Sequence, residues 1–247
     1  MTERTPNTRP IADELAAEGD VLFRWRSYIP LVLVPLFVIS LAGARRPTPF
    51  SFEIAAFVIA LAGLALRAWI VGTAPEGTSA RGTGQPTADL LNISGAYSVV
   101  RHPLYVANTV IWFGCSLIAG VWFLPVIVVL LSFIYHERIA VHEEAFLLQT
   151  FGDQFRVWAA SVPAIVPRFD RYRAPSSRFN PRKAFMQESH GLCALGTAFF
   201  FLDTLEDSVR LHAFHADARW LAIFAACTAP LAVVLRVKRS ARKMAKA

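Results

Sequence analysis

The chain has 247 residues, of which 55% are hydrophobic and only 17% are charged, and its mean hydropathy is +0.43. Soluble globular proteins carry roughly 25% charged residues, so this composition excludes an ordinary water-soluble domain and indicates an integral membrane protein. The formal net charge is +7. The basic residues cluster beside apolar stretches, where Lys and Arg attract anionic headgroups, so we expect membrane lipids as partners and no nucleic acid.

Six apolar stretches are long enough, or nearly so, to cross a bilayer as helices. They are Tyr28–Ala44, Phe50–Gly72, Leu104–Ala119, Val121–Tyr135, Gly191–Leu205 and Trp220–Val237. Gly120 alone separates the third from the fourth, which predicts a tight helical hairpin. The predicted fold is therefore an all-α integral membrane protein of about six transmembrane helices, with a core hairpin over 103–150 and a pocket at its cytoplasmic face.

The distribution of basic residues predicts the orientation. Most of the 25 Lys and Arg residues fall in segments that share one side if both termini are cytoplasmic, and the Arg45–Arg46 pair is the exception. We expect a multi-pass protein of a prokaryotic cytoplasmic membrane. The expected divisions are a polar segment 1–27, two spans in 28–72, a core 73–169, a basic juxtamembrane linker 170–190 that meets anionic headgroups, two spans in 191–237 and a basic tail 238–247.

The segment Ser94–Tyr105 reads S-G-A-Y-S-V-V-R-H-P-L-Y. Pro103 suits the first position of a helix, where its missing N–H would have no partner anyway. Arg101 and His102 then lie at a helix N-terminus, where free N–H groups and the helix dipole favour anions. Tyr97 and Tyr105 supply rings that can cover a flat or cationic ligand. The alternative is an interfacial membrane anchor made of Arg and Tyr.

A second polar segment, Tyr135–Gly152, continues the fourth span without a helix breaker until Gly152. Because the third and fourth spans form a hairpin, the start of one and the end of the other meet at the same membrane surface. His102 should therefore lie close to Glu143 and Glu144. A solvated charged helix surface is the alternative, above all for Glu144.

Together these segments resemble the isoprenylcysteine carboxyl methyltransferase and membrane phospholipid methyltransferase families. The resemblance covers about Leu66 to Phe169. Its motif is carried by Gly95, Tyr97, Arg101, His102, Pro103 and Tyr105, by Glu143, Glu144, Phe151, Gly152 and Phe155, and by Pro163 and Pro167.

The resemblance implies that S-adenosylmethionine is the cofactor and that it binds at the cytoplasmic face. The implied cofactor-binding residues are Tyr97, Arg101, His102, Pro103, Leu104, Tyr105 and Glu143, with Leu91 and Asn92 just upstream. A substrate-handling arginine of the family falls here on Ile139, which leaves Arg138 as the substrate-binding candidate and does not favour prenylcysteine.

We predict methyl transfer to a lipophilic acceptor, through a carboxylate, amine or hydroxyl, with His102 and Glu144 as the catalytic candidates. Glu144 or His142 could assist an amine acceptor, which must first lose a proton. No metal is expected, because methyl transfer does not require one. Two other functions fit part of the pattern. A membrane-embedded NADPH-dependent sterol or enone reductase shares an R-H-P-like motif, and a non-enzymatic transporter or assembly factor would share the span pattern.

Overall fold

The computed structural model describes residues 11–42, 48–78 and 88–244. In these ranges all regular elements are helices, and the only strand-like pairing is an isolated bridge between Gly95 and Arg173. The all-α membrane fold is confirmed. Residues 1–10 of the expected polar segment, the Arg45–Arg46 pair and the last three residues of the basic tail lie outside the described ranges.

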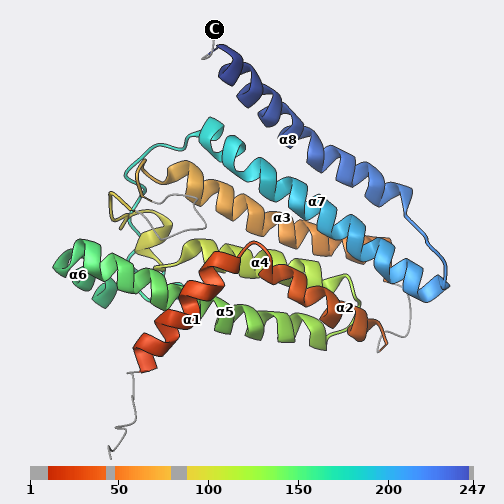
Figure 1. The fold of residues 1–247 in the computed structure, drawn as a ribbon, viewed down its shortest axis with the longest axis horizontal. Helices are drawn as coiled ribbons and strands as arrows, with labels where there is room; N and C mark the ends of the chain where they lie inside the picture. The colour runs from red at the N-terminus through yellow and green to blue at the C-terminus, as the bar shows by residue number, and fades with distance from the viewer. Residues whose placement is uncertain (1–10, 43–47, 79–87, 245–247) are drawn as a thin grey trace, which may run out of the picture.

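The centre of the fold is formed by α3 (Phe50–Thr73), α4 (Pro103–Leu117) and α5 (Phe123–Phe151), which lie side by side in Figure 1. Small residues let α3 and α4 approach closely, as is common between membrane helices. A Cβ atom on Gly63 would lie 2.9 Å from the Ala107 carbonyl oxygen, and one on Gly114 would lie 2.7 Å from the Ala60 backbone nitrogen. The predicted hairpin is present, and Gly120 in its turn has a φ of +66°.

Two long helices complete the bundle: α7 (Pro181–Leu211) packs against α3, and α8 (Ala218–Met244) packs against α7 (Figure 1). Trp220 is fully buried where α8 begins, and its ring contacts Phe57 and Phe199. Its indole N–H donates to Glu53 Oε2 over 2.8 Å. The aromatic cluster joins α3, α7 and α8 at the end of the bundle opposite His102.

The expected first span, Tyr28–Ala44, is not one helix. It contains a 3-10 turn η1 (Ile29–Val32) and a nine-residue α2 (Leu33–Leu41), while Gly43 and Ala44 lie outside the described ranges. The preceding α1 (Ile11–Trp25) lies against α5, and the chain bends by 92° between α1 and the η1–α2 segment. Pro30 lies inside η1, where proline interrupts a regular α-helix.

Among the residues that the structure describes, three helices are long and apolar enough to cross a membrane, namely Phe50–Thr73, Phe123–Phe151 and Ala218–Ser240, and the bent pair would make a fourth. At 15 residues, α4 spans only about 22 Å. The expected fifth span begins ten residues earlier than predicted, at Pro181, so the end of the expected linker 170–190 is helical. The predicted number of six spans is therefore not confirmed.

The helix of the predicted fourth span continues past Tyr135, as predicted. α5 is one uninterrupted helix of 29 residues that ends at Phe151. Gly152 follows with a φ of +51°, a conformation that L side chains rarely adopt, and α6 (Asp153–Ser161) then runs in a new direction. This continuity carries Glu143 and Glu144 of α5 to the level at which α4 begins.

Candidate active site

His102 lies between Glu143 and Glu144 of α5. It is the N-cap residue of α4, with Pro103 in the first turn, and its side chain is buried. Its Nε2 atom is 2.9 Å from Glu144 Oε1, and its Nδ1 atom is 3.4 Å from Glu143 Oε2. The structure thus brings together residues that the sequence places on separate helices.

This geometry favours the imidazolium form of His102, because both ring nitrogens face carboxylate oxygens. Burial lowers the pKa of His102, but the hydrogen bonds and negative charges of Glu143 and Glu144 outweigh burial, and the net effect raises the pKa above 6.5. The two carboxylates therefore favour a positively charged ring at the start of α4, where it can attract an anionic group.

Arg101 completes this charged cluster. Its Nη1 atom forms an ion pair with Glu144 Oε2 over 3.0 Å, so Glu144 uses one oxygen for Arg101 and the other for His102. The Nε atom of Arg101 is buried and has no hydrogen-bond partner among the described residues. These contacts give Glu144 an orienting position, while the Arg101 Nε–H remains available to an anionic ligand.

Aromatic rings extend from His102 into the helical hairpin. Tyr105 stacks on His102 with ring centroids 5.4 Å apart and on His136 with centroids 4.8 Å apart. His136 also stacks on Trp112, and its Nδ1 atom lies 3.0 Å from the Ser132 hydroxyl. The stack fixes the plane of the Tyr105 ring. The sequence analysis did not predict His136 and Trp112 as site residues. Trp112 lies about two helical turns after Tyr105, and His136 lies about two turns before Glu143.

Tyr97 lies beside the cluster, in η2 (Ala96–Ser98). Burial raises its pKa, and the nearby charge of Glu143 acts in the same direction, so its hydroxyl stays neutral. Trp158 of α6 donates its indole N–H to the Tyr97 carbonyl oxygen over 3.1 Å. The α6 helix thereby holds the loop that carries Tyr97.

The remaining predicted residues occupy different surroundings. Leu91 is buried in a small apolar cluster with Phe155 and Trp158. The Asn92 side chain accepts a hydrogen bond from the Ser94 backbone N–H over 3.2 Å and so shapes the loop before Gly95. Both residues stabilise the loop that carries Tyr97.

Arg138 points toward α1 rather than toward His102. Its guanidinium pairs with Glu18 of α1 over 3.1 Å and with its neighbour Glu137 over 3.2 Å. Ile139, which occupies the position of the family arginine, is almost completely buried. A substrate-binding role for Arg138 therefore stays a prediction, and in this structure the residue joins α1 to α5.

A second polar network, which the sequence did not indicate as a unit, joins three helices at the same end of the bundle. Arg67 of α3 donates to Asn108 of α4 over 2.6 Å and to Glu188 of α7 over 3.1 Å. Arg67 was visible in the sequence only as an unusual charge inside a span. Its partner Glu188 lies more than a hundred positions away, and only the packing of α7 on α3 reveals the pair.

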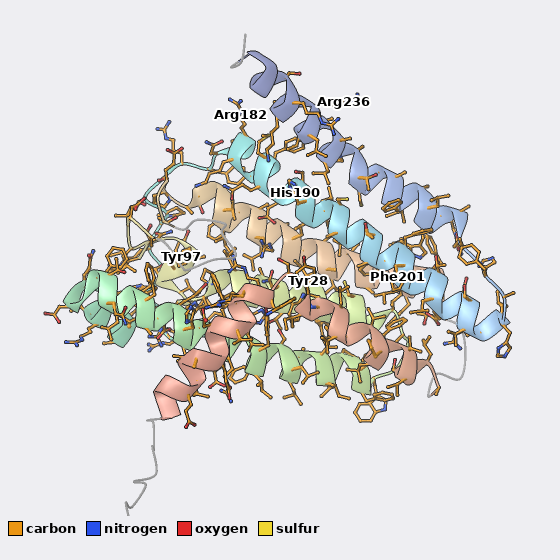
Figure 2. All side chains as sticks on the ribbon, viewed as in Figure 1. Tyr28, Tyr97, Arg182, His190, Phe201 and Arg236 are labelled. Carbon is orange, nitrogen blue, oxygen red and sulfur yellow. The ribbon has the colours of Figure 1, made fainter. Side chains whose placement is uncertain are left out.

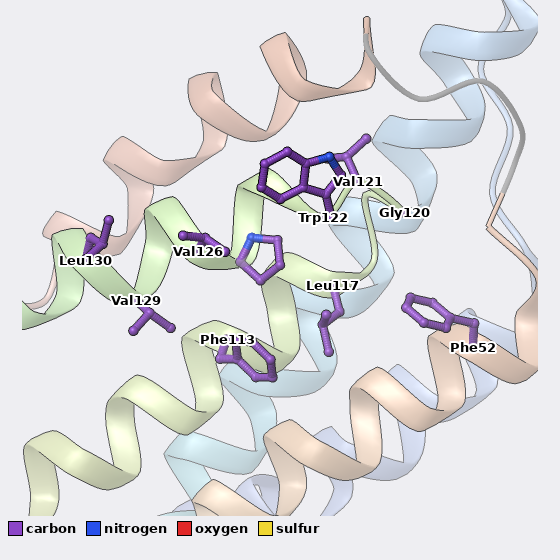
Figure 3. Close-up of a pocket in the computed structure, with 10 residues that line it drawn as sticks. Phe52, Phe113, Leu117, Gly120, Val121, Trp122, Val126, Val129 and Leu130 are labelled. Atoms are coloured by element: carbon purple, nitrogen blue, oxygen red, sulfur yellow. The ribbon is translucent and has the colours of Figure 1, made fainter.

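Two cavities differ in chemistry. One has a volume of about 650 Å³ and lies at the α4–α5 turn, where Figure 3 shows Phe52, Phe113 and Trp122 among its lining residues. Its lining carries no titratable side chain, so it offers a surface for acyl chains and no catalytic group. The other, of about 290 Å³, lies at the opposite end and includes Tyr97 and Leu104 in its lining. Figure 2 shows Tyr97 among the loops at that end.

Comparison with known proteins gives one match, and it covers the part of the chain that contains this cluster. Residues 53–154 match the family model of phospholipid methyltransferases, and this range contains both motif segments. No curated protein and no solved structure matches the chain. The match favours methyl transfer over a reductase or a transporter. Residues 53–154 therefore match a phospholipid methyltransferase domain, the family that the two motifs resemble, and this match indicates methyltransferase activity.

Proposed function

We propose that the protein transfers a methyl group from S-adenosylmethionine to a lipophilic acceptor in the membrane. The single observation that carries this proposal is the contact of His102 with both Glu143 and Glu144 inside the phospholipid methyltransferase domain. It places anion-binding and cation-binding groups side by side at one end of the helical hairpin. A zwitterionic donor with an additional positive charge fits such a pair of opposite charges.

The residues present fit this donor. Arg101 and His102 offer positive charge at the N-terminus of α4, and the buried Arg101 Nε–H has no partner among the described residues. They would hold the methionyl carboxylate. Glu143, whose Oε2 atom contacts His102 Nδ1, would bind the donor's hydroxyl or ammonium groups. Tyr97 and Tyr105 would shape the adenosine pocket, with Pro103 and Leu104 at the helix start.

When bound, S-adenosylmethionine supplies a methyl group that its sulfonium charge has already activated. The lone pair of the acceptor forms the new bond to the methyl carbon, and the carbon–sulfur bond breaks with its electrons on sulfur. The protein mainly has to align the two reactants, an effect worth up to roughly 7–11 kcal/mol of the barrier. His102 and Glu144 would contribute by fixing this geometry.

The acceptor would enter sideways from the bilayer, which explains why the domain is built from membrane helices. A carboxylate acceptor would need no base. An amine acceptor would first have to lose a proton, and Glu144 or His142 would assist. His142 lies 3.8 Å from Asp20 of α1, so α1 forms one side of this region.

The orientation is part of the same proposal. With both termini in the cytoplasm, the start of α4 and the end of α5 lie at the inner leaflet, where the basic residues between α6 and α7 meet anionic headgroups. These residues are Arg168, Arg171, Arg173 and Arg178, and Arg182 and Lys183 follow in the first turn of α7.

Donor binding tests the proposal. Isothermal titration of the detergent-purified protein with S-adenosylmethionine should show binding that His102→Ala and Glu143→Ala abolish without loss of the folded state. Glu137→Ala is the matched control, since it removes a carboxylate from the same helix and contacts Arg138 instead of His102. Unchanged donor affinity in both His102→Ala and Glu143→Ala would remove the site assignment.

A further inference from the structure

Four rings form one continuous stack that begins at the proposed donor site and runs into the helical hairpin. In order they are His102, Tyr105, His136 and Trp112, with ring centroids 5.4, 4.8 and 5.2 Å apart. Tyr105 and Trp112 belong to α4 and lie about two helical turns apart, whereas His136 belongs to α5. The His136 ring therefore fills the space between two rings of the opposite helix.

A chain of hydrogen bonds holds the edge of the His136 ring. The Thr109 hydroxyl donates its single hydrogen to the Tyr105 carbonyl oxygen over 3.0 Å. Its oxygen therefore accepts from the Ser132 hydroxyl, 2.7 Å away, and the Ser132 oxygen in turn accepts from His136 Nδ1–H over 3.0 Å. Thr109 Oγ1 also lies 3.4 Å from the same Nδ1 atom. The chain thus begins at the backbone of Tyr105 and ends on the ring that stacks on the Tyr105 side chain.

Packing alone does not account for a histidine at position 136. The side chain is 2% exposed, which favours the neutral ring. With the hydrogen on Nδ1, the Nε2 atom is an acceptor, and it is buried without a hydrogen-bond partner among the described residues. A buried acceptor without a partner destabilises a fold, and a phenylalanine would offer a ring for the stack without this loss.

The histidine supplies a fixed ring plane that a phenylalanine would lack. Rotation of an imidazole about its Cβ–Cγ bond has broad minima, so packing defines the plane of such a ring only loosely. The hydrogen bond from Nδ1 to Ser132 removes this freedom. Because the planes of His136 and Tyr105 differ by only 16°, a fixed His136 ring also fixes the ring of Tyr105.

The other face of Tyr105 contacts His102, with an interplanar angle of 12°. In the proposed donor site His102 would hold the methionyl carboxylate and Tyr105 would border the adenosine. The two ends of the donor would then be held by neighbouring rings of one stack. Donor affinity therefore depends on how firmly the second ring is held from the side of His136.

We propose that His136 is a positioning residue of the donor site, which sets the plane of the Tyr105 ring by stacking and is itself held by Ser132 and Thr109. This inference rests on the proposed function, because it takes Tyr105 as part of the pocket for the adenosine of S-adenosylmethionine. His136 acts through Tyr105 and need not touch the donor.

Donor affinity in a set of variants tests this role. The full chain in detergent micelles is titrated with S-adenosylmethionine by calorimetry, and the melting temperature of each variant is measured in parallel. His136→Leu should weaken donor binding by about tenfold, the combined value of two lost aromatic contacts. His136→Phe keeps the stack but loses the hydrogen bond, and Ser132→Ala loses the same hydrogen bond, so each should weaken binding by about threefold.

The double variant gives the sharpest test. Ser132 acts on the donor site only through His136 Nδ1, so Ser132→Ala should have no further effect on donor affinity when His136→Phe is already present. Additive losses in the double variant would overturn the inference, and so would wild-type affinity in His136→Leu. The double variant and its two parents keep the test decisive if His136→Leu does not fold.

Phe199→Leu is the matched control for general loss of packing. Its ring is fully buried and contacts Phe57 and Trp220 in the aromatic cluster at the opposite end of the bundle. The variant should lower the melting temperature and leave donor affinity unchanged. A loss of donor affinity as large as that of His136→Leu would show that any core defect weakens the site and would overturn the specific role of His136. A wild type that binds no S-adenosylmethionine would instead refute the proposed function itself.

Discussion

His102 Nδ1 lies 3.4 Å from Glu143 Oε2. This contact joins the N-cap of α4 to the part of α5 that extends beyond the apolar stretch. This contact depends on the length of α5, because a helix that ended with the apolar stretch at Tyr135 would stop two turns short of Glu143. The position of the charged cluster is therefore set by helix continuity as much as by the hairpin.

The protonation of His102 predicts a pH dependence. A pKa raised above 6.5 in the folded state means that the imidazolium stabilises the fold fully below the unfolded-state pKa. This stabilisation is lost as the pH rises through the raised folded-state pKa. The difference in melting temperature between the wild type and His102→Gln should thus be largest at mildly acidic pH and shrink at alkaline pH. A difference that grows with pH would contradict the imidazolium assignment.

Removing only one member of the Arg67–Glu188 ion pair should lower the stability of the protein strongly. Glu188→Ala leaves a half-buried guanidinium that still donates to Asn108, and removing one member of such a pair costs about 3–5 kcal/mol. The double variant Arg67→Met with Glu188→Leu removes both charges and should lose less stability than Glu188→Ala. Thermal unfolding in detergent measures both. Equal losses in the single and double variants would show that the charges do not act as a pair.

Close packing of α3 on α4 should make Gly63 intolerant of a larger side chain. Gly63→Val places new atoms against the Ala107 carbonyl oxygen and Ile111, so we expect a loss of about 1–3 kcal/mol. Ala62→Val is the control, because this neighbouring residue is exposed on the same helix and should change stability by less than about 0.5 kcal/mol. Similar melting temperatures for the two variants would argue against the close α3–α4 contact.

The helical hairpin and the charged cluster could be predicted from the sequence because their signals are local. Pro103 and Gly152 mark helix ends, and Gly120 marks the turn. The relation between His102 and Glu143 then follows from helix geometry alone. The same local signals allowed the resemblance to a methyltransferase family to be stated on individual residues.

Other features depend on long-range packing and could not be predicted. The broken first span differs from the prediction because hydropathy reports how apolar a stretch is and not whether it forms one straight helix. The early start of α7 at Pro181 was missed because polar and charged residues interrupt its first ten positions, so they form no continuous apolar stretch. Asn180 followed by Pro181 is nevertheless a typical helix start. The contacts of Arg138 with α1 and of Arg67 with α7 join segments that no spacing rule connects.

Methyl transfer itself tests the central claim most directly. The purified protein is incubated with S-adenosylmethionine that carries a radiolabelled methyl group and with a bilayer lipid extract, and label in the extracted lipid is counted. We predict that the wild type labels the lipid fraction, that His102→Ala reduces the rate by roughly 100-fold or more through loss of alignment, and that Glu137→Ala does not. Lipid labelling by His102→Ala at the wild-type rate, or no labelling by a wild type that binds the donor, would contradict the account.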